Sequence, residues 1–256
     1  MDRAAVLDAC GRPLTPTTVA RALALVSSGR AEWVGQDPPT IRLRYAAEPP
    51  PPGTERAVTP PGFRDQPLLL HICCGPCSTY CVRRLRELAW HVEGYWVNPN
   101  IHSYSEHERR RESLVAYAQR IALPLHQTAG YQMAEFFRRV AGHERFRERC
   151  AICYRMRLEH TADEAARRGF VAISTTLLIS PYQDQEAIRR IGEEVAGARG
   201  LRFYYENLRR GYAESRHMAR EAGLYMQRYC GCLSSEWEAR DRRAETHGPH
   251  HGAPTP

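Results

Sequence analysis

The sequence predicts a protein of the α/β class, in which helices flank a parallel β-sheet. From about residue 68, short apolar or β-branched stretches alternate with helical stretches of about 10 to 15 residues, as is typical of βαβ units. The 256 residues are 43% hydrophobic and 25% charged, which provides enough apolar material for one large core. No apolar run approaches the roughly 20 residues of a membrane-spanning helix. We therefore expect a globular protein that does not associate with a membrane.

The first 63 residues precede this alternating pattern. Residues 15–28 (TPTTVARALALVSS) predict one amphipathic helix with Thr or Ser caps, and residues 40–46 (TIRLRYA) predict one strand. One helix and one strand are too little for a core, so we expect residues 1–46 to be a small appendage that packs on the main domain. Residues 47–63 hold six prolines and two glycines and predict a linker, because proline cannot donate to a helix or sheet ladder.

The elements of the main domain, residues 64–240, follow in order. The first half predicts a short buried strand, a helix, a second strand and a second helix, over residues 68–72, 78–89, 92–99 and 105–122. Ser103 or Ser105 caps the second helix, whose first turn carries acidic residues. The second half predicts a strand, a helical pair flanking two cysteines, a β-branched strand and a helix, over residues 124–130, 149–169, 170–180 and 184–198.

Strands that alternate with helices favour a parallel sheet with right-handed crossovers. Functional groups in such sheets lie beyond the carboxyl ends of the strands, and Cys73 and Cys74 directly follow the first strand. Residues 241–256 are polar, rich in Gly and Pro and without periodicity, so we predict a disordered tail.

Charge and composition narrow the function. The formal net charge is +7, and all 36 basic residues are arginines. Arginines that neutralise phosphates release counterions, so a polyanionic partner is indicated, with a generally basic surface as the alternative. The absence of lysine excludes a Schiff-base mechanism and the lysine of a phosphate-binding P-loop. The N-terminus lacks the apolar stretch of a secretory signal, so we expect a cytoplasmic protein.

Eight of the nine cysteines fall into three groups. The groups are Cys73, Cys74, Cys77 and Cys81; Cys150 and Cys153; and Cys230 and Cys232. Because cytosolic thiols stay reduced, such groups indicate metal binding or catalysis rather than a disulfide framework. Thiolates from distant segments suit either tetrahedral zinc or a [4Fe-4S] cluster, and the adjacent pair at the start of the first group favours the cluster.

Individual cysteines differ in their expected roles. Cys10 has no neighbouring cysteine, and Cys81 lies on the inner face of a helix, so both are expected to be inert. Cys77 leaves a structural and a ligand role open. Gly231 favours a turn between Cys230 and Cys232, which indicates a redox or ligand role for this pair.

Five stretches resemble, in order, the QueH-type epoxyqueuosine reductases. They are LLHICCGPCSTY, YWVNPNIHSYSEHERR, RCAICYRMRLEHTADEAARRGF, TTLLISPYQDQEAI and YCGCLSSEWEAR, and the resemblance covers about residues 67–240. It implies a Rossmann-like (nucleotide-hydrolase-like) parallel sheet. It also implies an oxidoreductase that reduces epoxyqueuosine to queuosine at the wobble position of tRNA, the final step of queuosine biosynthesis, without a corrinoid or ATP.

The resemblance also implies roles for individual residues. It places ligands of a [4Fe-4S] cluster at Cys73, Cys74, Cys150 and Cys153, and a redox-active pair at Cys230 and Cys232. An additional mononuclear iron held partly by a carboxylate is implied, and Asp184 is the candidate for that carboxylate. The implied partners are tRNA carrying epoxyqueuosine in its anticodon and an electron donor of unknown identity. The N-terminal sixty residues and the crowding by Cys77 and Cys81 depart from the family pattern.

Two other functions remain open at this point. A cluster-dependent tRNA-thiolating enzyme would carry a Ser-Gly-Gly pyrophosphate loop after the first strand, where this chain has Cys-Cys-Gly-Pro. A zinc-stabilised nucleic-acid-binding module would use the same thiols for zinc. Iron and sulfide content separates the zinc protein from the reductase, and ATP binding separates the thiolating enzyme from it.

Overall fold

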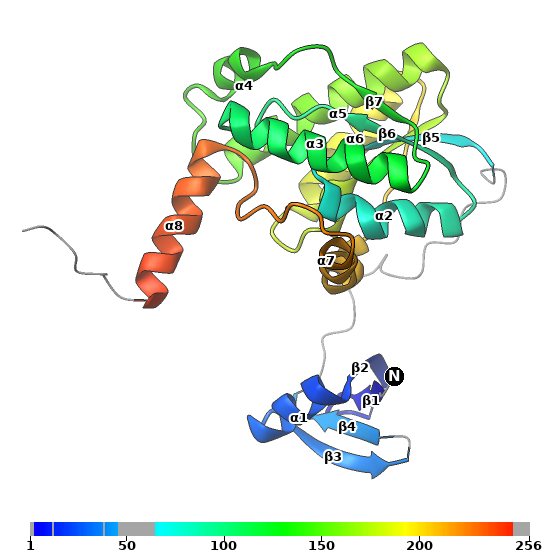
Figure 1. Cartoon of the computed structure of the whole chain (residues 1–256), viewed down its shortest axis with the longest axis vertical. Helices are drawn as coiled ribbons and strands as arrows, with labels where there is room; N and C mark the ends of the chain where they lie inside the picture. Colours follow the sequence, from blue (N-terminus) through cyan, green and yellow to red (C-terminus); the bar gives the residue numbers. More distant parts are fainter. Residues whose placement is uncertain (1–2, 12, 38, 46–64, 248–256) are drawn as a thin grey trace, which may run out of the picture. The chain divides into compact units, whose positions relative to one another are not determined.

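The computed structural model describes residues 3–11, 13–37, 39–45 and 65–247. The chain divides into two compact units, Met1–Arg56 and Ala57–Pro256 (Figure 1). The predicted linker at residues 47–63 lies outside the described residues.

The larger unit is built on a parallel sheet of five strands in the order β7-β6-β5-β8-β9. The strands are β5 (Pro67–His71), β6 (His91–Trp96), β7 (Leu125–Gln127), β8 (Ala172–Thr175) and β9 (Arg202–Phe203). This arrangement confirms the predicted α/β class and parallel sheet.

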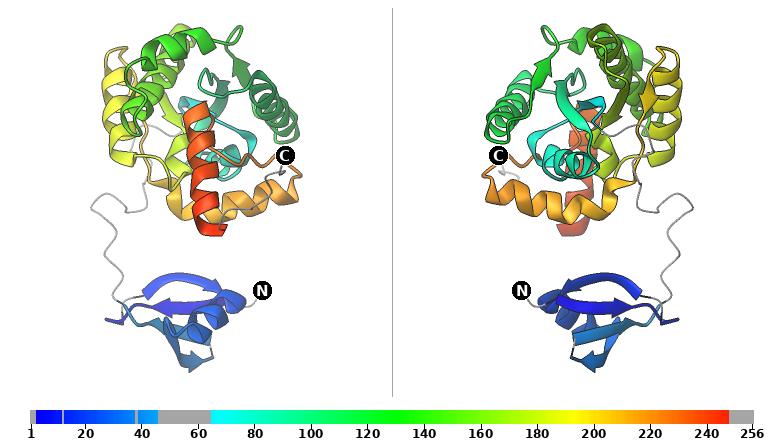
Figure 2. Two further views of the ribbon diagram at one scale, coloured as in Figure 1. Left: turned by 90° about the vertical axis from the view of Figure 1, so that its left-hand side faces the viewer. Right: turned by 90° about the vertical axis from the view of Figure 1, so that its right-hand side faces the viewer.

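Helices cover both faces of this sheet. The connecting helices are α2 (Gly75–Glu87), α3 (Tyr104–Arg120), α4 (Met133–Val140), α5 (Glu148–Arg168) and α6 (Gln185–Gly197). Helices α2 and α3 pack together on one face, and α5 and α6 pack together on the other (Figures 1 and 2). The right-handed crossovers of parallel sheets explain why helices from the two halves of the chain lie on opposite faces.

The strand order creates a switch point between β5 and β8. The chain moves outward from β5 through β6 to β7, returns across the sheet to β8, and then continues outward to β9. The connections after β5 and β8 therefore leave the sheet in opposite directions. Ligands in open α/β sheets bind beyond the carboxyl strand ends at such a point.

Strand β5 lies at the centre of the core. Leu68, Leu69 and Leu70 are all buried, so apolar residues occupy consecutive positions instead of alternating ones. A strand covered by helices on both faces requires this pattern. The central strand is consequently closed to solvent along its length, and polar chemistry is confined to its ends.

Two predicted elements of this unit differ from the structure. The strand predicted over 170–180 ends at Thr175, because the Thr175 hydroxyl accepts a hydrogen bond from the N–H of Leu177 and begins a 3₁₀ turn, η1 (Thr176–Ile179). The cysteines of the predicted helical pair do not lie between two helices. Both Cys150 and Cys153 lie in the first turns of α5.

The C-terminal part contains two further helices that the sequence analysis did not delimit. A 3₁₀ turn, η2 (Leu208–Gly211), leads into α7 (Tyr212–Glu221), and α8 (Leu233–His247) follows the last cysteine pair. Helix α8 continues into the segment predicted as a disordered tail, and residues 248–256 lie outside the described residues. No helix among the described residues combines the length and the apolar character needed to cross a membrane.

The smaller unit has a sheet of its own in the order β2-β1-β4-β3. Its elements are β1 (Arg3–Leu7), β2 (Pro13–Thr18), α1 (Val19–Ser27), β3 (Ala31–Gln36) and β4 (Pro39–Leu43). Six buried apolar side chains from β1, α1, β3 and β4 form a separate core. The expectation that this segment lacks a core was therefore wrong, because three of its four strands were missed. Helix α1 begins at Val19 instead of Thr15, since residues 13–18 pair with β1.

Two glycines of α6 give a test of packing in the larger unit. A Cβ atom at Gly192 would lie 2.6 Å from the ring of Phe203, whereas a Cβ atom at Gly197 would meet no atom within 4 Å. Gly192→Ala should therefore lower the free energy of unfolding by about 1–3 kcal/mol through overpacking. Gly197→Ala should raise it by about 0.4–1 kcal/mol by restricting the unfolded chain. Urea denaturation measures both changes, and equal effects would contradict the close contact of α6 with β9.

Candidate metal centre

Three thiols meet where β5 ends. Cys73 and Cys74 follow the strand directly, Cys74 is the N-cap of α2, and Cys77 lies in the first turn of that helix. The three Sγ atoms lie within 4.8 Å of one another, and the Sγ atoms of Cys73 and Cys74 are 3.7 Å apart. Within the part of the chain that the structure describes, this is the group of three side chains with the spacing of a metal site.

Thr176 joins the thiol group to the neighbouring strand. The backbone N–H of Cys73 donates to Thr176 Oγ1 over 3.0 Å, and the Thr176 hydroxyl donates to Cys73 Sγ over 3.3 Å. Thr176 directly follows β8, so these two hydrogen bonds span the switch point between β5 and β8. The thiol group therefore occupies the position at which this fold class binds ligands.

The three thiols share protons unequally. Hydrogen bonding from the Cys74 and Cys77 thiols lowers the pKa of Cys73. Burial raises the pKa of Cys74, and hydrogen bonding with Cys73 raises that of Cys77. Gln227 donates its amide N–H to Cys74 Sγ over 2.9 Å. A metal that takes all three sulfurs must displace the protons that they carry.

His71 supports this loop as a neutral side chain. Burial lowers its pKa to about 3, so the imidazole carries no charge at neutral pH. Its Nδ1 lies 2.8 Å from Thr175 Oγ1 and its Nε2 lies 3.3 Å from the carbonyl oxygen of Val97. A carbonyl oxygen can only accept, so Nε2 carries the proton and Nδ1 accepts from Thr175. The ring thus ties the ends of three strands together.

The cysteines of α5 lie apart from the three-thiol group. Cys153 is buried in a small apolar cluster with Phe136, Val140 and Met156, and Cys232 packs against that cluster. Cys150 is half-buried and lines a cavity. The structure therefore brings Cys73 and Cys74 together with Cys77, and does not bring Cys150 or Cys153 within the same spacing.

The segment that carries Cys230 and Cys232 is held by its backbone. The buried guanidinium of Arg110 donates to the carbonyl oxygens of Cys230 and Tyr229 over 2.9 and 3.2 Å. The N–H of His102 donates to the carbonyl oxygen of Gly231 over 2.9 Å. Both cysteines are free thiols in the structure. The backbone of this segment is thus fixed while its two sulfurs are left without a covalent partner.

Gly231 permits a close approach between two segments. A Cβ atom at Gly231 would lie 2.9 Å from Asn100 Nδ2 and 3.1 Å from Ile101 Cγ1, and its φ of 154° is one that other residues rarely adopt. Glycine is therefore required here for contact with the loop after β6, in addition to the turn that the sequence predicted.

A buried cation lies among the thiols of all three segments. The side chain of Arg157 is 1% exposed, and its Nη2 has no hydrogen-bond partner among the described residues. Burial acts to lower its pKa, but the electrostatic attraction of Cys153, Cys230 and Cys73 outweighs burial, so the guanidinium stays charged. Its long contacts, of 3.4 Å, are to the carbonyl oxygen of Cys153 and to Asn98 Oδ1. Within the described part of the chain no carboxylate pairs with it.

These observations fit a thiolate-bound metal group. A buried charge that is not paired is strongly unfavourable, so Arg157 calls for an anion in its surroundings. Thiolates around a metal supply negative charge, and the sulfurs of Cys153, Cys230 and Cys73 attract this guanidinium. The residues present are therefore suited in type and in charge to such a group.

Asp184 has a structural role in the geometry. It is the exposed N-cap of α6, and its Oδ1 accepts a hydrogen bond from the N–H of Ala187 over 3.0 Å. It lines the same cavity as Cys150 and lies outside the three-thiol group. Cys81 is buried in the main core and burial raises its pKa, as expected for an inert thiol.

Sequence reasoning missed three contributors to this region. Cys77 was left open, although its position one turn after the N-cap of α2 places its sulfur beside the adjacent pair. Gln227 lies in a stretch without periodicity and could not be assigned a partner. Arg157 was hidden among other arginines, but its spacing of two residues from Arg155 indicates that the two side chains point in different directions from the helix.

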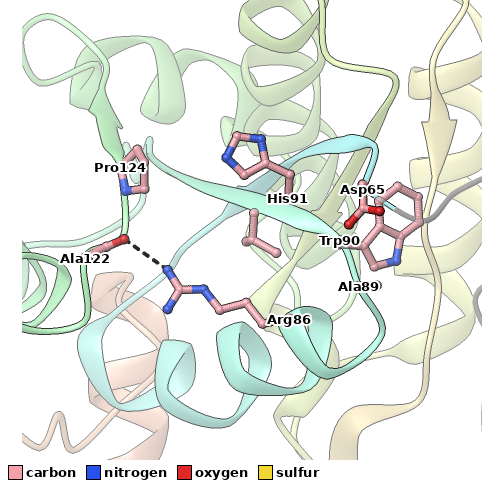
Figure 3. Close-up of a pocket in the computed structure, with 8 residues that line it drawn as sticks. Asp65, Arg86, Ala89, Trp90, His91, Ala122 and Pro124 are labelled. Atoms are coloured by element: carbon pink, nitrogen blue, oxygen red, sulfur yellow. Dashed lines mark hydrogen bonds between the residues drawn. The ribbon is translucent and has the colours of Figure 1, made fainter.

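A cavity among the described residues lies at the opposite edge of the sheet. It has a volume of about 650 Å³ and is lined by residues around the amino ends of β5 and β6, including Asp65, Trp90 and His91 (Figure 3). Arg86 closes one side by donating to the carbonyl oxygens of Ile121 and Ala122. This cavity is therefore separate from the thiols, which lie at the carboxyl ends.

Known proteins are similar to the part of the chain that carries these thiols. The family model for epoxyqueuosine reductase QueH matches residues 68–238. The chain is 40% identical over 171 residues to the epoxyqueuosine reductase QueH of Dehalococcoides mccartyi, covering 67% of this chain and 93% of the relative. It is 34% identical over 185 residues to that of Thermotoga maritima, covering 70% of this chain and 94% of the relative.

A distant structural likeness is to the U34-tRNA thiolase NcsA of Methanococcus maripaludis with its [4Fe-4S] cluster. It has a TM-score of 0.46 and 14% identity, and covers 73% of this chain and 68% of that one. At this distance no ligand of that protein is assigned to this chain. The family match, in contrast, includes the thiols at the end of β5, those of α5 and those before α8, and it spans more than half of the chain. The chain therefore belongs to the QueH family of epoxyqueuosine reductases.

Proposed function

We propose that this chain reduces epoxyqueuosine to queuosine at the wobble position of tRNA, with a [4Fe-4S] cluster held by cysteines at the carboxyl edge of the sheet. The observation that supports the cluster best is Arg157, a buried cation that has no carboxylate partner among the described residues and is attracted by the thiols of three segments. An anionic thiolate-bound cluster provides the counter-charge that this side chain lacks.

The proposed ligands are Cys73, Cys74, Cys150 and Cys153. The first two follow β5 and the last two begin α5, so the cluster would join the two sides of the switch point. Cys77 is an additional candidate, because its sulfur lies with those of Cys73 and Cys74. When bound, the cluster supplies single electrons, and a metal with an open position polarises the epoxide oxygen as a Lewis acid.

The dithiol of Cys230 and Cys232 can supply the electrons and protons that the reduction consumes. Conversion of an epoxide to an alkene breaks two C–O bonds, consumes two electrons and two protons, and releases water. Oxidation of two thiols to a disulfide forms one S–S bond and yields two electrons and two protons. An external electron donor must then reduce the disulfide before the next turnover. Gln183 donates its amide N–H to Cys230 Sγ over 3.5 Å and so helps to position this sulfur.

A second iron is proposed with Asp184 as one ligand. Oδ1 of Asp184 caps α6, which leaves Oδ2 for a metal. Cys150, one of the proposed cluster ligands, lines the same cavity as Asp184. Hard carboxylate and soft thiolate donors together are compatible with iron.

The tRNA partner accounts for the charge of the chain. The net charge is +7, and every basic residue behind it is an arginine. Guanidinium groups bind phosphates through paired N–H donors. A tRNA substrate implies a cytoplasmic location. The tyrosines and arginines of residues 203–220 and the loop at 98–104 are candidates for contact with the anticodon.

One distance also fits a zinc protein. Two thiolates on one tetrahedral zinc ion, at Zn–S bonds of about 2.3 Å, lie about 3.8 Å apart. The 3.7 Å separation of the Cys73 and Cys74 sulfurs matches this value. A zinc-stabilised nucleic-acid-binding module is therefore the second candidate function, and metal content decides between the two.

The proposed function has a direct test. Protein purified without oxygen should contain about five irons and four sulfides per chain, four of each in the cluster and one iron at the second site. Supplied with a reductant and with tRNA carrying epoxyqueuosine, it should produce queuosine, which mass spectrometry of the digested nucleosides detects. Zinc in place of iron, together with unchanged epoxyqueuosine, would refute the reductase and favour the zinc module.

The ligand assignment is tested by single substitutions. Cys73→Ser and Cys150→Ser should each lose the cluster absorbance, because each removes one thiolate from a site built across two distant segments. Cys10→Ser is the matched control, since Cys10 is exposed in the smaller unit and should keep the full iron content. Retention of the cluster in both variants would show the assignment to be wrong. If the cluster is lost in Cys73→Ser and in Cys77→Ser but retained in Cys150→Ser, then Cys77 is a ligand in place of Cys150.

Arg157 is tested through the reduction potential. Reduction adds negative charge to the cluster, so removal of a nearby cation in Arg157→Met should lower the potential by roughly 60 mV for each 1.4 kcal/mol of lost stabilisation. Arg155→Met is the control, because Arg155 lies on the same helix but pairs with Glu194. A potentiometric titration with spectroscopic detection measures both variants. Equal potentials in the two variants would contradict a cluster beside Arg157.

A further inference from the structure

A second cavity opens beside Cys150, on the carboxyl side of the sheet. It has a volume of about 460 Å³, which falls within the range of roughly 300–1,000 Å³ for small-molecule sites. Its lining comes from the connection between α4 and α5, from the first turns of α5, from residues 181–185 and from η2. Three segments that are far apart in the sequence, residues 146–154, residues 181–185 and η2, therefore contribute to one cavity.

We propose that this cavity receives the wobble nucleoside of the tRNA after its base has been extruded from the anticodon loop. The proposal rests on the proposed function and names the binding site for its substrate. Enzymes that act on a base inside folded nucleic acid extrude it, stack it between aromatic or apolar side chains and contact its base-pairing edge. Each of these three requirements has a counterpart in the lining of the cavity.

Two exposed rings supply the stacking surfaces. Tyr182 is 75% exposed and Phe146 is 60% exposed, which is unusual for large aromatic side chains. They come from separate segments, one before α6 and one before α5, and both line the cavity. The Tyr182 ring meets the edge of Tyr212, and the Phe146 ring is covered by the guanidinium of Arg149 at 5.6 Å. Neighbouring side chains thus hold both rings in place.

Two arginines supply charge for the phosphates on either side of the base. Arg147 and Arg209 line the cavity, and among the described residues neither forms an ion pair with a carboxylate. Phosphate oxygens are the natural partners of exposed guanidinium groups.

Gln185 supplies the polar group for the base edge. Its side chain is buried and lines the cavity, and both its amide oxygen and its amide nitrogen lack a hydrogen-bond partner in the described part of the chain. Buried amides are normally satisfied, so an unpaired one at a cavity wall is suited to a ligand. Queuosine bases are 7-deazaguanines and keep the guanine pairing edge, whose donors and acceptor match one carboxamide.

The cavity also leads to the proposed reactive groups. Cys150 and Asp184 lie in its lining, so the cyclopentane substituent of a base bound there would lie near the proposed metal ligands. The Tyr154 hydroxyl donates to Gln183 Oε1 over 2.8 Å, and Gln183 in turn donates to Cys230 Sγ over 3.5 Å. These contacts connect the wall of the cavity with the redox pair.

Binding to an anticodon stem-loop tests the stacking part of the proposal. The probe is a fluorescent stem-loop with guanosine at the wobble position, titrated with the cluster-containing protein in an anisotropy assay. Tyr182→Ala and Phe146→Ala should each weaken binding about 5- to 100-fold, as loss of one base–aromatic stack does. Both side chains are exposed, so neither change should prevent folding. Gln119→Ala is the control, because Gln119 is exposed near the end of α3, at the amino edge of the sheet, and should bind as the unchanged protein does.

A modified base tests the role of Gln185. A stem-loop with unsubstituted purine at the wobble position still stacks but lacks the exocyclic groups of guanine. The unchanged protein should prefer guanosine about 10-fold, and Gln185→Leu should remove this preference, as expected for the loss of one amide–base pair. A preference that persists in Gln185→Leu, or unweakened binding by both aromatic variants, would overturn the proposal.

The outcomes separate this proposal from the proposed function. Conversion of epoxyqueuosine by the unchanged protein, combined with normal binding by Tyr182→Ala and Phe146→Ala, would exclude the cavity and leave the reductase standing. Weakened binding by these variants, combined with no conversion by the unchanged protein, would support the base site and refute the reductase.

Discussion

Burial of β5 on both faces is the constraint that arranges the rest of the larger unit. A strand covered by helices on each side can place polar groups only beyond its ends, and the switch point selects the carboxyl end. Two cysteines lie at this end, between β5 and the first turn of α2. The loops after β6 and β8 end at the same edge and provide Asn98 and Thr176 for Arg157 and Cys73.

Charge balance explains why distant segments converge there. Each thiolate is costly to bury alone, and so is the guanidinium of Arg157. Attraction to the sulfurs of Cys153, Cys230 and Cys73 raises the pKa of Arg157, and this attraction requires β5, α5 and the segment before α8 to lie close together. The neutral state of His71, caused by burial, leaves arginines, among them Arg157 and Arg110, as the buried cations that face these sulfurs.

The sequence predicted the larger unit well because its signals are local and repeated. The alternation of strands and helices predicted the parallel sheet, and the helix predicted at 184–198 agrees closely with α6. The smaller unit was mispredicted, since β1 and β3 are short and mix apolar with polar residues. The site could be predicted only in part. The spacing of the cysteines identified them as candidate metal ligands, but the grouping of Cys77 with Cys73 and Cys74 depends on tertiary packing.

The contact of Gly231 with the loop after β6 provides an internal reporter of loop opening. The N–H of His102 donates to the carbonyl oxygen of Gly231, so its hydrogen is shielded only while the two segments touch. Exchange of that amide with deuterium occurs through opened states, and its rate gives the free energy of opening. The segment that carries Cys230 and Cys232 can therefore be followed by a single backbone amide on a different loop, without any label on the sulfurs themselves.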